Sequence, residues 1–169
     1  IVNIAKSQIG YHEGNNADEY HGTNTSGGNN YTEYGRWAGN KNGAWCGFFV
    51  SWCAHQARIP DDIVISSNTN ASRGNGQKMH DWYSNLGVYM DLNSSTISTI
   101  SVGDIVLINN GTIYGHIGLV ETVDYASGIV HTIEGNWSNA VVRKTRTYGN
   151  SNGNITGFAH PNYVSDDNL

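Results

Sequence analysis

A cysteine stands where a glycine-containing loop gives way to an apolar segment. Cys46 follows Gly43-Ala44-Trp45, and the apolar run that it begins, with Pro60 as a stop, predicts a buried helix over residues 46–57. A thiol at a helix N-terminus lies at the positive end of the helix dipole, which favours the thiolate. Because the thiolate is the nucleophilic form, this position raises the hypothesis of cysteine catalysis.

A cysteine nucleophile needs a base, and one of the seven histidines is unusual in its surroundings. His116 lies between Gly115 and Gly118, in an otherwise apolar stretch that predicts a strand over residues 116–123. Glycine neighbours leave room for a group to approach the imidazole. An imidazole without a role in an apolar strand would be costly, so His116 is the expected base.

Two polar side chains on the next predicted strand, residues 129–136, are candidates to orient that base. Glu134 and Asn136 are two residues apart, so in a regular strand they share a face. Either side chain could accept the Nδ1 proton of the His116 imidazole and thereby select its tautomer. From the spacing alone, Glu134 could equally cap a strand end near solvent.

The elements that would position these residues follow a clear order along the chain. Helical patterns cover residues 1–9, 32–37, 46–57 and 77–85, and strand patterns cover residues 104–108, 116–123, 129–136, 141–148 and 157–160. Helices first and strands second favour an α+β fold over an alternating α/β fold. The short connections between the strands predict an antiparallel meander.

The composition suits one domain with a packed core and excludes several classes of protein. Of the 169 residues only 14% are charged, and the formal net charge is −5. Nine Lys and Arg residues are too few for the clustered cations of a nucleic-acid interface. The basic patch of Arg143, Lys144 and Arg146 is interpreted as a solvated strand face. No stretch approaches the roughly 20 apolar residues of a membrane-spanning helix.

Both cysteines are expected to be free thiols. Cys46 and Cys53 are seven residues apart on one predicted helix, a rise of about 10 Å, whereas a disulfide needs Cα atoms within about 7 Å. Cys53 lies in the middle of the helix and is interpreted as a small buried hydrophobic residue. The chain begins at Ile1 without a visible leader, which we interpret as a mature domain or a piece of a longer protein.

Acidic side chains near the N-terminus do not form a recognisable metal site. Glu13, Asp18, Glu19 and Glu33 lack the regular spacing of a calcium loop. No set of Cys and His has zinc-ligand spacing, and no glycine-rich loop matches a phosphate-binding motif. We therefore expect neither a metal nor a cofactor.

The order Cys46, His116, Glu134, Asn136 resembles the CHAP family of cysteine-, histidine-dependent amidohydrolases and peptidases. The matching segments, spread over about residues 1 to 160, are Ile9–Glu13, Thr32–Gly35, Ala44–Cys53, Val102–Val106, Gly115–Val120 and Ile133–Asn136. The cysteine and histidine motifs are specific in combination, although each is weak by itself.

This resemblance implies a papain-like, NlpC-type fold in which the helix that begins at Cys46 packs on an antiparallel sheet. It implies one catalytic domain over residues 1–163, followed by a tail or linker at 164–169. The implied roles are Cys46 as nucleophile, His116 as general base, Glu134 as the group that orients His116, and Asn136 as its support. The implied reaction is cleavage of a peptidoglycan amide bond, by an N-acetylmuramoyl-L-alanine amidase or an endopeptidase.

The chain departs from the family in two places. Some members carry a calcium loop just before the cysteine, whereas Gly39–Gly43 holds no carboxylate, so that metal is not expected. Many carry a glutamine before the cysteine for the oxyanion, and its absence leaves the Cys46 backbone N–H and an unidentified donor. The aromatic residues expected at the rim of the cleft, as substrate contacts, are Tyr34, Trp45, Tyr114 and Trp137.

Other functions are compatible with these residues. A different acyl-transfer enzyme on the same fold, such as a transglutaminase-like or bacteriocin-type hydrolase, would use the same groups. A cell-wall binding module could keep the fold and lack the chemistry. For a peptidoglycan hydrolase we expect an extracellular location at the bacterial cell wall, as a secreted autolysin or a phage- or mobile-element-encoded lysin. We expect a monomer, which in a longer protein can be joined to further wall-binding domains.

Overall fold

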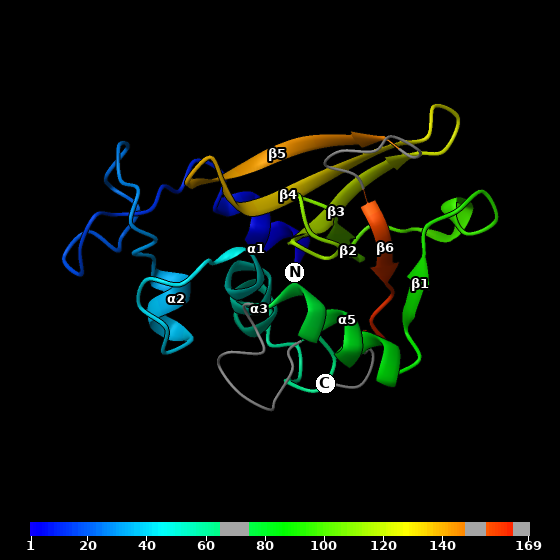
Figure 1. Ribbon diagram of the computed structural model, residues 1–169, viewed down its shortest axis with the longest axis horizontal. Helices are drawn as coiled ribbons and strands as arrows, with labels where there is room; N and C mark the ends of the chain where they lie inside the picture. Colours follow the sequence, from blue (N-terminus) through cyan, green and yellow to red (C-terminus); the bar gives the residue numbers. More distant parts are fainter. Residues whose placement is uncertain (65–74, 148–154, 164–169) are drawn as a thin grey trace.

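The computed structural model describes residues 1–64, 75–147 and 155–163. Its helices are α1 (Val2–Ser7), α2 (Glu33–Trp37), α3 (Cys46–Gln56) and α5 (Gly76–Asn85), with a 3-10 turn η1 (Ile97–Thr99) (Figure 1). Its strands are β1 (Tyr89–Asp91), β2 (Ile105–Ile108), β3 (His116–Asp124), β4 (Ile129–Trp137), β5 (Ala140–Thr147) and β6 (Ile155–Ala159). Every helix and strand that the sequence predicts is present, with bounds that agree within two residues.

The strands form one antiparallel sheet in the order β1-β6-β2-β3-β4-β5 (Figure 1). From β2 to β5 each strand pairs with the next, which is the predicted meander. β6 then returns to the free edge of β2, and β1 pairs with β6. The sequence does not predict β1, because three residues are too short to display a period-two pattern. The prediction of an α+β fold is confirmed.

The sheet buries apolar side chains on both faces. Leu119 and Ile133 belong to the cluster under α3, whereas Val120 and Val130 belong to a second cluster with Phe158. Successive residues of a strand point to opposite faces, so the two clusters divide along β3 and β4 by alternation. The side chains beside Ile133 on β4 therefore point away from α3.

Helix α3 occupies the centre of the core. It contacts α1, α2, β3 and β4, and Figure 1 shows it between α2 and the sheet. Eight of its 11 residues are buried, as expected for a helix that is apolar on nearly all sides. Gly135 brings β4 against this helix, because a Cβ at that position would lie 2.6 Å from the Cβ of Phe49. The packing fixes the N-terminus of α3 next to β3 and β4.

Some expectations fall on parts of the chain that are not described. The predicted tail at 164–169 and Tyr148, the predicted end of the fourth strand, lie outside the described residues. Within the described ranges, none of the helices combines the length and the apolar character that crossing a membrane requires.

Candidate active site

Cys46 is the first residue of α3, and 8% of the residue is exposed to solvent. The N-cap residue, Trp45, makes no side-chain cap hydrogen bond, and the first N–H groups of a helix have no acceptors within it. Both cysteines are free thiols, as predicted. Cys53 has no exposed surface, and burial raises the pKa of its thiol well above the ordinary value. Of the two cysteines, Cys46 is therefore the one that solvent can reach.

His116 begins β3 and is almost fully buried. Its Nε2 lies 2.9 Å from Oε2 of Glu134. The expectation that Nδ1 faces the orienting group is therefore wrong: Nε2 makes that contact, and Nδ1 is the nitrogen left for Cys46. Burial disfavours the charged imidazole, but the interactions with the Cys46 and Glu134 side chains prevail and raise the pKa of His116 to about 9.

Glu134 is completely buried and its carboxylate is fully occupied. Besides the imidazole it accepts hydrogen bonds from Thr132 Oγ1 at 2.5 Å and from the Arg146 guanidinium, with Nε at 2.8 Å and Nη2 at 2.5 Å. Burial works to raise its pKa, but His116 and Arg146 prevail and lower the pKa to about 2. Because Glu134 is buried, the alternative interpretation that it caps a strand end near solvent is excluded.

Arg146 belongs to the site, although the sequence pattern indicates a solvated strand face. The interpretation placed it on a solvated strand face, yet Arg146 is only 5% exposed and clamps Glu134. Alternation along β5 separates it from Arg143, which pairs with Glu121 through bonds of 2.8 and 2.9 Å. A period of two from Glu134 points to Thr132. Arg146 lies opposite Val130 in the β4–β5 register, four residues from Glu134, so no local pattern indicates that its side chain reaches this carboxylate.

Gly118 provides the space for this arrangement. A Cβ at Gly118 would lie 2.7 Å from Cγ of Glu134, so a larger residue on β3 would displace the carboxylate. The glycine two residues after His116 therefore does leave room for a polar group, as the sequence suggests, and that group is Glu134.

Asn136 does not share the face of Glu134. The β4–β5 register shifts between Glu134 and Trp137, and Asn136 has a φ of 60°, so the period-two expectation fails at this point. Its Nδ2 donates to Oδ1 of Asn30 at 3.5 Å, and within the described residues no hydrogen bond joins it to His116. The neighbouring Trp137 packs against the imidazole instead, with ring centroids 5.4 Å apart at 61°.

Two of the four expected rim aromatics are core residues. Tyr34 and Trp45 have no exposed surface and stack on each other with centroids 5.4 Å apart. The expectation that they contact substrate at the rim is therefore wrong, because the packing of α2 on α3 covers both rings. Tyr114 and Trp137 are partly exposed, as a rim position requires.

Glu13 ties Trp45 to the N-terminal loop. It is 1% exposed, and its two oxygens accept hydrogen bonds from Trp45 Nε1 at 2.7 Å and from the Asn30 backbone N–H at 2.9 Å. Asn30 in turn holds Asn136. This chain of contacts joins the residue before Cys46 to the end of β4.

The acidic and metal-ligating side chains form no metal site among the described residues. Over residues 1–64, 75–147 and 155–163, no three His, Cys, Asp or Glu side chains converge in a way that could hold an ion. Of the acidic residues near the N-terminus, Glu13 and Glu19 direct their carboxylates to donors of the protein itself.

The two pKa shifts predict how the stability depends on pH. The pKa of His116 rises from 6.5 to about 9 on folding, so its contribution is complete below pH 6.5 and is lost as the pH rises through 9. The pKa of Glu134 falls from 4.5 to about 2, so its contribution is present above pH 4.5 and is lost as the pH falls through 2. We expect the unfolding temperature to decline between pH 6.5 and 9, and to decline less in His116→Gln. Equal slopes for the two proteins in thermal unfolding scans would contradict this.

The fold and these contacts define a cysteine and histidine site on a papain-like α+β scaffold. A family model, the CHAP domain, matches residues 37–136, which is more than half of the chain. The chain therefore belongs to the CHAP domain family, whose members are cysteine-, histidine-dependent amidohydrolases and peptidases. The suspected family is thus confirmed, and with it the coarse class of hydrolase.

A solved structure supports the fold. The chain superimposes on the structure titled "The crystal structure of Ly7917" with a TM-score of 0.52 and 14% sequence identity, over 95% of this chain and 60% of that one. At this identity the likeness concerns the fold alone, and the chain spans 60% of the length of that structure. No curated protein matches the sequence.

Proposed function

We propose that this protein is a peptidoglycan hydrolase that cleaves an amide bond of the stem peptide or of the cross-bridge. The observation that carries the proposal is a buried series of side-chain interactions. The imidazole of His116 interacts with Cys46 and with the carboxylate of Glu134, and Arg146 holds that carboxylate. Among CHAP domain proteins such a site serves cysteine-dependent amide hydrolysis. The bond cleaved is that of an N-acetylmuramoyl-L-alanine amidase or of an endopeptidase.

The proposed reaction is acyl transfer through Cys46. The thiolate attacks the carbonyl carbon, a C–S bond forms, and the carbonyl electrons move to the oxygen. As the tetrahedral intermediate collapses, the C–N bond breaks and the His116 imidazolium gives its proton to the leaving amine. A water molecule then loses a proton to His116 and hydrolyses the thioester, which restores the thiolate.

The electrostatics of the site support each proton position in that scheme. A His116 pKa of about 9 favours the imidazolium at neutral pH, which is the partner that a thiolate requires. The ionised Glu134 accepts a hydrogen bond from the Nε2–H group and leaves Nδ1 for the thiol. The N–H of Cys46, at the start of α3, is the proposed oxyanion donor.

The proposed setting follows from the proposed substrate. A wall hydrolase acts outside the cytoplasmic membrane, as a secreted enzyme or as a phage- or mobile-element-encoded lysin. We propose a monomeric catalytic domain, which additional wall-binding domains could direct to its substrate in a longer protein.

The reactivity of Cys46 distinguishes an enzyme from a silent wall-binding module. At pH 7 we expect iodoacetamide to add once, at Cys46, because Cys53 is completely buried and its thiol pKa is raised. Intact-mass measurement over time, with peptide mapping, gives the site and the rate. Reaction at Cys46 no faster than at free cysteine would contradict the proposed activation and favour the binding module.

Mass spectrometry of fragments released from purified cell walls tests the substrate directly. The protein and its Cys46→Ala variant are incubated with walls that differ in their stem and bridge peptides. Fragments with a new L-alanine amine, absent with the variant, identify an amidase, and a new amine within the stem or bridge identifies an endopeptidase. No Cys46-dependent product from any wall would overturn the proposal.

A further inference from the structure

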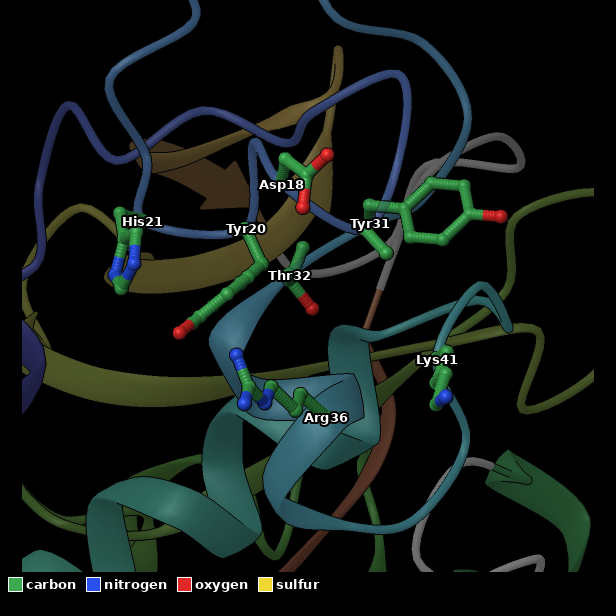
Figure 2. Close-up of a pocket in the computed structure, with 8 residues that line it drawn as sticks. Asp18, Tyr20, His21, Tyr31, Thr32, Arg36 and Lys41 are labelled. Atoms are coloured by element: carbon green, nitrogen blue, oxygen red, sulfur yellow. The ribbon is translucent and has the colours of Figure 1, made fainter.

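A cavity of about 560 Å³ lies beside α2, apart from the cysteine and histidine. It is lined by Ala17, Asp18, Tyr20, His21, Tyr31, Thr32, Arg36 and Lys41. Figure 2 shows Tyr20 and His21 on one side, Tyr31 and Lys41 on the other, and Thr32 and Arg36 between them. Its volume suits a ligand of a few residues, and its lining is about equally polar and apolar.

The two cations of this cavity, Arg36 and Lys41, have no anionic partner among the residues that the structure describes. Within the described ranges, Arg36 and Lys41 make no ion pair, as is also true of Arg58, Lys78 and Lys144, whereas Lys6, Arg143 and Arg146 each contact a glutamate. The Arg36 guanidinium lies over the Tyr20 ring, 4.0 Å from its centroid. This stacking restricts the side chain but uses none of its N–H donors, which remain available to a ligand in the cavity. A guanidinium and an ammonium beside one cavity favour a carboxylate or a similar anion.

An acidic side chain in the same lining further restricts the chemistry of a ligand that would fit the cavity. The Asp18 backbone N–H is bonded to Asn16, while its carboxylate lines the cavity and makes no hydrogen bond or ion pair within the described residues. A ligand that complements both the two cations and the Asp18 carboxylate carries a carboxylate together with an amide N–H or an ammonium group. A peptide segment with a free carboxylate meets this requirement.

The cavity is close enough to Cys46 for one substrate to reach both. Lys41 precedes Cys46 by five residues, so their Cα atoms are at most about 18 Å apart. At the other end, Tyr31 follows Asn30, whose side chain contacts Asn136 beside Trp137 and the imidazole. An extended peptide of about five residues spans this distance.

We propose that this cavity is a substrate subsite in which Arg36 and Lys41 bind a carboxylate of the peptide whose amide bond is cleaved at Cys46. Asp18 accepts a hydrogen bond from an N–H group of the same peptide. The inference rests on the proposed function for the identity of the peptide. The stem peptide offers two sources of this anion, the α-carboxylate of its glutamyl residue and its C-terminal carboxylate.

The test measures binding to the Cys46→Ala variant, which leaves the peptide intact. Three synthetic peptides serve as probes: L-alanyl-γ-D-glutamyl-L-lysyl-D-alanine with both carboxylates free, with only the glutamyl carboxylate amidated, and with only the C-terminus amidated. Each peptide is titrated by calorimetry into the Cys46→Ala protein. The titrations are repeated with a variant that also carries Arg36→Gln and Lys41→Gln. The matched control adds Arg58→Gln with Lys78→Gln, which removes the same charge from exposed positions outside the cavity.

We expect one amidation to weaken binding roughly tenfold or more, since it removes the charge that strengthens the hydrogen bonds from Arg36 and Lys41. The Arg36 and Lys41 substitutions should weaken binding of the peptide with both carboxylates free by the same factor. In that variant the amidation should cause no further loss of affinity, while the control variant should bind each peptide as the Cys46→Ala protein does. The amidation that matters identifies the source of the carboxylate. Equal binding of all three peptides, or equal loss in the control, would overturn the subsite.

A second probe separates this inference from the proposed function. Succinate and its diamide are titrated while the NMR signals of the Arg36 guanidinium are followed. Shifts with succinate but not with the diamide support an anion site even if no stem peptide binds and no wall is cleaved, in which case only the wall substrate is wrong. No shift with succinate, together with no effect of either amidation, overturns the anion site itself.

Discussion

Replacing Cys46 with alanine is expected to lower kcat/KM for wall fragments by at least about 10⁴-fold, because the thiolate forms the only covalent bond in the proposed reaction. The change removes one sulfur atom at a position that still touches solvent, so the fold should persist. Cys46→Ser is expected to be nearly as damaging, since a serine hydroxyl is far less acidic than a thiol. Initial rates of amine release on a soluble muropeptide measure both losses.

The second cysteine supplies the control for this experiment. Cys53→Ala also removes a thiol from α3, but from a fully buried position in the middle of the helix. It should lower the free energy of unfolding slightly and leave the rate close to that of the parent. A Cys46→Ser variant with a rate near that of the parent would exclude nucleophilic catalysis by Cys46.

Replacing Arg146 with methionine is expected to have the largest effect on stability. The substitution leaves the buried Glu134 carboxylate without its guanidinium, and breaking a buried ion pair on one side costs about 3–5 kcal/mol. The rate should fall as well, because the carboxylate that orients His116 loses two of its donors. Urea unfolding gives the free energy, and the rate is measured well below the unfolding transition.

Arg143→Met is the matched control, since Arg143 lies on the same strand and also pairs with a glutamate. Its side chain is 57% exposed, so solvent replaces the lost partner and the effect should be much smaller. Adding Glu134→Gln to Arg146→Met should recover part of the stability but not the rate, because the uncompensated charge is then gone. Equal destabilisation by the two arginine substitutions would contradict the buried clamp.

The local pattern was sufficient for every helix and strand except β1, and for three residues of the site. The apolar run after Cys46 predicts α3 and its start, and the strand patterns place His116 and Glu134 on neighbouring strands. These predictions succeed because helix and strand formation depend on near neighbours, through periods of 3.6 and 2. The CHAP resemblance rests on the same short segments, and the family match confirms it.

The sequence by itself thus determined the α+β class, the helices and strands other than β1, the free thiols and the residues proposed as nucleophile, base and orienting acid. The tertiary structure decided which nitrogen of His116 meets Glu134, that Arg146 clamps this carboxylate, and that Asn136 turns to Asn30. It also buried Tyr34 and Trp45 and formed the cavity at Arg36. Strand register, a register shift and helix packing join residues that are far apart in the chain, and no local period encodes those contacts.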